Sequence, residues 1–177
     1  MTGLASLDAH GALIEPATLQ IQRLLPGPIE RAWRWLTDSD LRRRWLAAGE
    51  MELTPGSTFE LIWRNDELSD SPSARPAHIG PENRVLMQMI EVDPPHSLSF
   101  EWPGAGEVTW ALEPQGDEVL FTLTHRRANS RSLLLGVSSG WHMHLDILAA
   151  KATGRRAPSF WDGLPALRAD YDRRFPA

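Results

Sequence analysis

The sequence contains no cysteine and only one tyrosine, and none of its apolar runs is long. The absence of cysteine excludes disulfides, thiolate catalysis and zinc sites built on cysteine. No apolar run approaches the roughly 18 residues that a helix needs to span a bilayer. Residues 1–16 also lack the basic start and the apolar centre of a secretory signal. We therefore expect a soluble, cytoplasmic protein without a membrane span.

Excess positive charge is also missing, because 18 lysines and arginines stand against 23 aspartates and glutamates. The resulting net charge of -5 argues against a nucleic-acid partner, since such proteins usually present a basic face. Two local basic clusters, residues 42–44 and 126–127, lack a glycine loop or aromatic context. We interpret them as a solvated helix face and a strand end rather than as phosphate sites.

A chain of 177 residues suits one domain and can bury a core without disulfides or metal. We expect an N-terminal extension over residues 1–16, the domain over 17–156, and a C-terminal extension over 157–177. The last of these carries a short helix around residues 164–173. Eight tryptophans are unusual for this length. Tryptophan fills cores or lines ligand cavities, and composition leaves both alternatives open.

Strand and helix signals alternate through the first half of the chain. In residues 18–25 the side chains of Leu19, Ile21, Arg23 and Leu25 share one face of a strand. The segments that follow are a helix over 29–37, a second short helix capped at Asp38 or Ser39 and running to Ala47, a short strand over 50–53, a strand over 58–64, and a long surface loop over 65–83.

The second half predicts an antiparallel meander followed by a long helix. Four strands, over residues 85–92, 98–102, 108–112 and 119–125, are separated by turns rich in proline or glycine. The helix starts at Asn129-Ser130 and runs to about Gly154. One apolar stripe follows it, made of Leu134, Val137, Trp141, Leu145, Leu148 and Ala152.

Two histidines lie in this helix, and helical geometry separates them. Successive residues advance by about 100°, so His142 and His144 point roughly 160° apart and cannot share one metal ion. His142 and Asp146 face away from the apolar stripe, and we expect them to form a surface ion pair. His144 lies at the edge of the stripe. The chain therefore predicts no metal site and no cofactor.

Three polar residues on apolar faces stay open to two interpretations. His125 and His144 are either buried and hydrogen-bonded within the core, or they orient a polar group of a ligand. Arg23 needs either an acidic partner or an anionic ligand, because an unpaired buried arginine is costly. No nucleophile elbow or ordered triad is evident, so no catalytic residue is predicted.

Several short motifs occur in the order found in one known superfamily. They are Pro28-Ile29-Glu30-Arg31-Ala32-Trp33, Leu36-Thr37-Asp38, residues 41–45, Phe59-Glu60-Leu61, Asp93-Pro94-Pro95, Leu98-Ser99-Phe100-Glu101-Trp102, Leu123-Thr124-His125, and Gly140-Trp141 with Leu145-Asp146 and Leu148. Together they resemble the START-like SRPBCC superfamily, in the branch similar to the activator of the heat-shock chaperone ATPase. The resemblance covers residues 19–154, and residues 65–83 depart from its common pattern.

This resemblance implies an α+β helix-grip fold. A curved antiparallel sheet wraps around the long C-terminal helix, with two short helices after the first strand and an apolar cavity between sheet and helix. Members of the superfamily bind lipids, hormones or polyketides, and some are cyclases. The chaperone-activating role belongs to longer relatives with an additional domain, so it is not expected here.

We therefore predict non-catalytic binding of a small hydrophobic ligand in this cavity. The predicted lining consists of Trp63, Phe100, Trp102, Trp110, Phe121, His125, Trp141, His144 and Leu145. One alternative is a cyclase-like or dehydratase-like enzyme that uses His125 or His144 as acid or base. Another is a protein-interaction module of the stress or co-chaperone kind, with residues 65–83 or the segment around Trp161 binding a partner or forming a homodimer.

Overall fold

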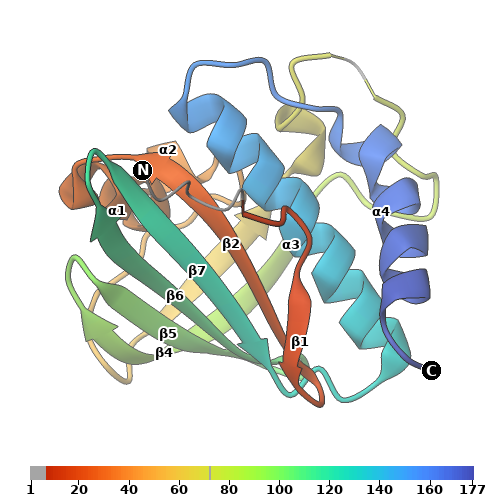
Figure 1. The fold of residues 1–177 in the computed structure, drawn as a ribbon, viewed down its shortest axis with the longest axis horizontal. Helices are drawn as coiled ribbons and strands as arrows, with labels where there is room; N and C mark the ends of the chain where they lie inside the picture. The colour runs from red at the N-terminus through yellow and green to blue at the C-terminus, as the bar shows by residue number, and fades with distance from the viewer. Residues whose placement is uncertain (1–6, 72) are drawn as a thin grey trace, which may run out of the picture.

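The computed structural model describes residues 7–71 and 73–177 (Figure 1). Residues 1–6 of the predicted N-terminal extension and Pro72 of the predicted surface loop lie outside the described residues. The elements in chain order are β1 (Ala12–Glu15), β2 (Thr18–Pro26), α1 (Ile29–Thr37), α2 (Ser39–Arg42), β3 (Thr58–Trp63), the 3-10 helix η1 (Asn65–Glu67), β4 (Asn83–Asp93), β5 (Ser97–Trp102), β6 (Gly106–Gln115), β7 (Glu118–Arg126), α3 (Arg131–Ala152) and α4 (Phe160–Arg174).

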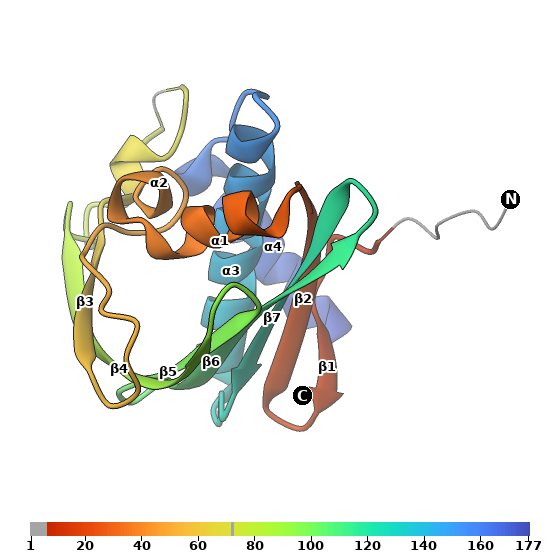
Figure 2. The same ribbon diagram turned by 90° about the vertical axis from the view of Figure 1, so that its left-hand side faces the viewer.

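The strands form one seven-stranded antiparallel sheet in the order β1-β2-β7-β6-β5-β4-β3. Strands β3 to β7 make a meander, and β2 joins the last of them, so the start and the end of the strand series lie side by side. Figure 2 shows the sheet curving around α3, with α1 and α2 closing one end. This is the helix-grip arrangement, and the predicted α+β fold class is confirmed.

The core lies between the concave face of the sheet and α3. Strand alternation places every second side chain of β2, β5, β6 and β7 on this face. The stripe predicted for α3 meets them there, with Leu145 and Leu148 fully buried. Ser130 caps the helix, because its hydroxyl oxygen accepts a hydrogen bond from the backbone N–H of Leu133 at 3.1 Å.

Both ends of the chain pack onto the domain. Strand β1, which the sequence did not predict, adds to the edge of β2. Helix α4 begins four residues earlier than predicted and lies alongside α3 (Figure 1). It buries Phe160, Trp161 and Tyr171. The division into a domain with two extensions stays a proposal.

Two predictions for residues 38–53 are wrong. Helix α2 ends at Arg42 rather than Ala47, because the next backbone hydrogen bonds, from Arg44 to Leu41 and from Trp45 to Arg42, close a tighter turn. Residues 50–53 form no strand, since the chain leaves the edge of β3 after a single bridge between Ala48 and Ile62.

Arg42 corrects the interpretation of residues 42–44 as a solvated face. Its side chain is 0% exposed, and its guanidinium donates to the carbonyl oxygens of Leu36 and Thr37 at 3.1 Å and to that of Gly49. Burial lowers the pKa of Arg42 to about 10. The arginine therefore holds the turn between α1 and β3 together from inside. The pattern of three arginines gave no sign of which one the turn encloses.

Candidate functional site

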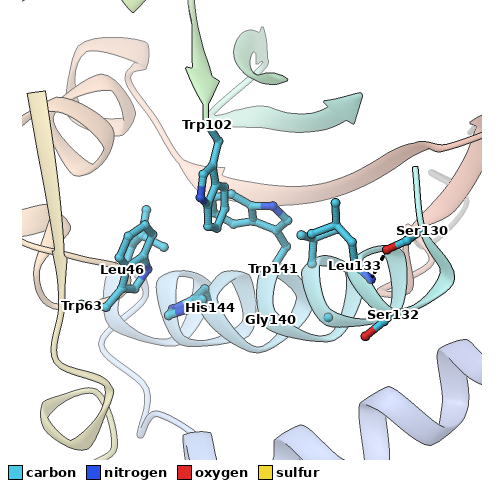
Figure 3. A pocket seen from close by; sticks show the side chains of 11 residues that line it. Leu46, Trp63, Trp102, Ser130, Ser132, Leu133, Gly140, Trp141 and His144 are labelled. Atoms are coloured by element: carbon cyan, nitrogen blue, oxygen red, sulfur yellow. Dashed lines mark hydrogen bonds between the residues drawn. The ribbon is translucent and has the colours of Figure 1, made fainter. Parts of the chain in front are cut away.

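A cavity of about 530 Å³ lies between α3 and the part of the sheet nearest to β3. It is lined by Leu46, Trp63, Trp102, Ser130, Ser132, Leu133, Gly136, Val137, Gly140, Trp141 and His144. Figure 3 shows Leu46 and Trp63 at one end, Ser130 and Ser132 at the other, and Trp102 reaching towards α3 from the sheet.

A second cavity of about 570 Å³ adjoins the first on the side of α4. Both share the same five lining residues, which are Trp63, Trp102, Gly136, Gly140 and His144. The second cavity extends towards Asn83, Phe160 and Leu164. We call the two together the groove.

Two glycines of α3 form the floor of the groove. Gly136 and Gly140 lie one turn apart on the same face as His144. A Cβ atom added at Gly140 would meet no atom within 4 Å, and one at Gly136 would meet only the guanidinium of Arg168 at 3.6 Å. Because glycine inside a helix costs roughly 0.5–1 kcal/mol relative to alanine, this space carries an energetic penalty.

The walls of the groove are aromatic. The rings of Trp63 and Trp102 stack with centroids 5.4 Å apart and planes 22° apart. Trp102 also meets Trp141 edge to face at 6.2 Å. These three residues come from β3, β5 and α3, so the aromatic wall runs from the sheet to the helix.

Among the described residues that line the first cavity, His144 alone combines deep burial with a titratable group, and it is 6% exposed. Its Nδ1 atom lies 2.8 Å from the carbonyl oxygen of Trp45. The imidazole ring also packs against Phe160, with centroids 4.9 Å apart. Burial lowers the pKa of His144 to about 4, against the raising effect of the Trp45 hydrogen bond. The side chain is therefore neutral at pH 7.

His125 lies in the core rather than in the groove, and both of its ring nitrogens are hydrogen-bonded. The indole N–H of Trp141 donates to its Nδ1 atom at 3.0 Å, so its Nε2–H donates to the carbonyl oxygen of Ala105 at 2.6 Å. Burial lowers the pKa of His125. Both nitrogens have protein partners, and the residue fixes the orientation of Trp141.

Four more predicted residues lie behind the groove wall, and these are Phe100, Trp110, Phe121 and Leu145. All four are 0% exposed, and Trp110 packs edge to face against both phenylalanines. These side chains are buried in the core between the central strands and α3 and do not line the groove. Of the nine predicted lining residues, the structure brings Trp63, Trp102, Trp141 and His144 together at the groove.

The floor of the groove and its exposed end at Ser130 and Ser132, here called the mouth, were not predicted from the sequence. Gly136 and Gly140 precede His144 at intervals of four, which places all three on one helix face. That spacing was the available signal for the floor. Leu46 and the serines at the mouth carried no signal, because a turn and a helix cap bring them to the site.

His142 and Asp146 form the predicted pair, but the prediction that the pair lies on the surface is wrong. Their side chains lie 3.3 Å apart, but His142 is only 4% exposed. Helix α4 covers that face, and the Tyr171 hydroxyl lies 2.8 Å from Nδ1 of His142. Asp146 also binds the guanidinium of Arg23 at 2.8 Å. The acidic partner expected for Arg23 is therefore Asp146.

The part of the chain that the structure describes holds neither a metal-binding cluster nor a membrane-spanning helix. Within it, no group of three histidines, aspartates or glutamates is placed to hold a metal ion. None of the helices in residues 7–71 and 73–177 combines the length and apolar character needed to cross a bilayer.

Known proteins share this fold over most of the chain. A Bordetella parapertussis protein solved by solution NMR is 38% identical, with a TM-score of 0.80. The match covers 100% of this chain and 97% of the Bordetella chain. CalU16 from Micromonospora echinospora is 21% identical over 88% of this chain and 86% of its own, with a TM-score of 0.64. DynU16, from the dynemicin biosynthetic locus, is 17% identical over 81% of this chain and 50% of its own, with a TM-score of 0.62.

The last two likenesses show the fold alone. No curated protein sequence matches the chain. The family model described as activator of Hsp90 ATPase homolog 1-like protein matches residues 26–152, which is most of the chain. The chain therefore belongs to the Hsp90 ATPase activator homolog 1-like family, within the START-like SRPBCC superfamily that its motifs resemble.

Proposed function

We propose that the protein binds a small hydrophobic molecule in the groove and does not transform it. The observation that carries the proposal is the cavity of about 530 Å³ between α3 and the sheet, with aromatic walls and a glycine floor. Ligand pockets typically measure about 300–1,000 Å³ and are mostly apolar, with a few placed polar groups. Next to the groove, buried side chains of the sheet and of α3 form a continuous hydrophobic core.

The chemistry of the first cavity favours binding over the cyclase or dehydratase alternative. Among its described lining residues, His144 is the only titratable side chain. With a pKa near 4, His144 is a weak base at neutral pH, whereas an efficient acid–base catalyst has a pKa near the working pH. His125, the other histidine considered for catalysis, has both nitrogens engaged by protein atoms.

Filling the groove tests the proposal. N-phenyl-1-naphthylamine, a neutral probe that fluoresces in apolar surroundings, is titrated into the protein. We expect saturable binding to the unmodified chain and at least a tenfold loss in Gly140→Leu, because the new side chain enters open space. Ala166→Leu introduces the same side chain at a small residue on an exposed face of α4 outside the groove, and should leave binding unchanged.

Circular dichroism first confirms that both variants fold. Equal binding to Gly140→Leu and to the unmodified chain would place the probe elsewhere and contradict the proposal. Absence of saturable binding to the unmodified chain would contradict it as well.

A further inference from the structure

The hydrogen bond to Trp45 decides which nitrogen of His144 carries a proton. A backbone carbonyl oxygen only accepts hydrogen bonds, so Nδ1 of His144 must be the donor at 2.8 Å. A neutral imidazole has one N–H, and it is used here. Nε2 is therefore a bare acceptor, and the burial of the ring keeps it so at neutral pH.

Nε2 of His144 makes no hydrogen bond to any protein atom among the described residues, whereas Nδ1 does. The side chain is more than nine-tenths buried and lines both cavities of the groove. The rings of Phe160 and Trp141 flank the imidazole at 4.9 and 6.4 Å. The ring is thus held in place with an unpartnered acceptor inside the groove.

The other polar groups of the first cavity differ from Nε2 in whether they donate or accept hydrogen bonds. Indole N–H groups of Trp63 and Trp102 can only donate, and the serine hydroxyls at the mouth can donate or accept. Ser132 at the mouth is exposed, and His144 lies twelve residues further along α3, about 18 Å away at 1.5 Å per residue. The deep part of the groove therefore offers a group that only accepts.

We propose that the ligand of the groove carries a neutral hydroxyl or N–H group that donates to Nε2 of His144. This inference rests on the proposed function and narrows the ligand class to phenols, alcohols or N–H compounds with an apolar body. At Nε2 itself, carboxylates without a donor are disfavoured, because their oxygens would face its lone pair. Protonating His144 to receive such an anion would place a charge in a buried site.

Matched probes separate the contribution of a hydrogen-bond donor on the ligand from that of its apolar body. 2-Naphthol, naphthalene and 2-naphthoate are each used to displace N-phenyl-1-naphthylamine from the protein at pH 7. We expect 2-naphthol to bind about fivefold or more tightly than naphthalene, the effect of one hydrogen bond, and 2-naphthoate to bind more weakly than 2-naphthol. In His144→Phe, which keeps a ring and removes both nitrogens, the preference for 2-naphthol over naphthalene should disappear.

His144→Asn guards against a folding defect in the phenylalanine variant. Its amide N–H can still donate to the Trp45 carbonyl. Its Oδ1 is bonded directly to Cγ and does not reach the position of Nε2, so this variant should also lose the preference for 2-naphthol. Retention of the full preference in His144→Asn overturns the inference. Equal displacement by 2-naphthol and naphthalene, or none by 2-naphthol, also overturns it. The proposed function stands or falls separately on binding of N-phenyl-1-naphthylamine itself.

Discussion

His144 gives up a proton far more readily in the folded protein than in the unfolded chain, because folding encloses its ring between α3, Trp45 and Phe160. A neutral imidazole suits this enclosure, whereas an imidazolium does not. The same enclosure that leaves an acceptor in the groove thus makes the residue a determinant of stability against acid.

Stability should fall as the pH drops from about 6.5 towards 4. In this range the unfolded chain, with a histidine pKa near 6.5, binds more protons than the folded protein, where the pKa of His144 is about 4. By pH 4.5 this difference costs about 2–3 kcal/mol. Urea unfolding at pH 7.5 and 4.5 measures it, with His144→Asn as the control that lacks this proton site.

His125, whose pKa burial also lowers, adds a loss of the same sign in both proteins. The difference between the unmodified chain and His144→Asn therefore isolates His144. An identical loss of stability in the two would show that His144 does not titrate as proposed.

Individual polar residues were predictable to different degrees. The need of Arg23 for an acidic partner followed from its place on an inward strand face, and Asp146 fills that role. The burial of His142 was not predictable, because helix α4 covers it, and that of Arg42 was not, because the chain from Leu36 to Gly49 turns around its side chain. The position of a residue on a helix sets the direction of its side chain, whereas the packing of other segments sets how exposed that side chain is.

Helix α3 combines close packing along one stripe with open space along another. Its bounds and apolar stripe were predicted from periodicity and from the Ser130 cap within a few residues. The groove follows from the absence of side chains at Gly136 and Gly140, which a search for apolar positions does not register. Strand alternation instead pointed to Phe100, Trp110 and Phe121, which are fully buried in the core.

Adding a methyl group at Gly140 should stabilise the protein. Gly140→Ala introduces a Cβ that meets no atom within 4 Å, and alanine favours a helix over glycine by about 0.5–1 kcal/mol. Gly163→Ala in α4 is the matched control, because its Cβ would lie 2.7 Å from the sulfur of the buried Met143. Denaturant unfolding should show a gain for Gly140→Ala alone; a loss of stability there would mean that the floor of the groove is not open.

At the scale of the whole molecule, one hydroxyl fastens three separate parts of the chain. The Tyr171 oxygen accepts from the backbone N–H of Gly11 at 2.7 Å, and the hydroxyl is also hydrogen-bonded to Nδ1 of His142 at 2.8 Å. It therefore joins α4 and the segment before β1 to α3. The sequence predicted both end segments only as extensions, because the hydrogen bond that joins them, from Gly11 to Tyr171, spans 160 residues.

Tyr171→Phe should loosen this junction without removing the ring. The Gly11 N–H and Nδ1 of His142 both lose their partner, which costs about 1–3 kcal/mol for buried groups. Hydrogen exchange should accelerate at the Gly11 amide, while the Ala128 amide, bonded to Ala17 at 3.0 Å, serves as an internal reference. Unchanged exchange at Gly11 would rule out the fastening role of the hydroxyl.

The order of the strands has a consequence for self-association. In the sheet that the described residues form, β1 and β3 are the edge strands, and each is protected in its own way. Strand β1 has four residues with a register shift between Leu13 and Glu15, and β3 exchanges two backbone hydrogen bonds of 3.0 Å with Ala48 through Ile62. Short, irregular or covered edges give a second copy little free backbone to pair with. The same edges thus guard the native protein against strand-by-strand aggregation.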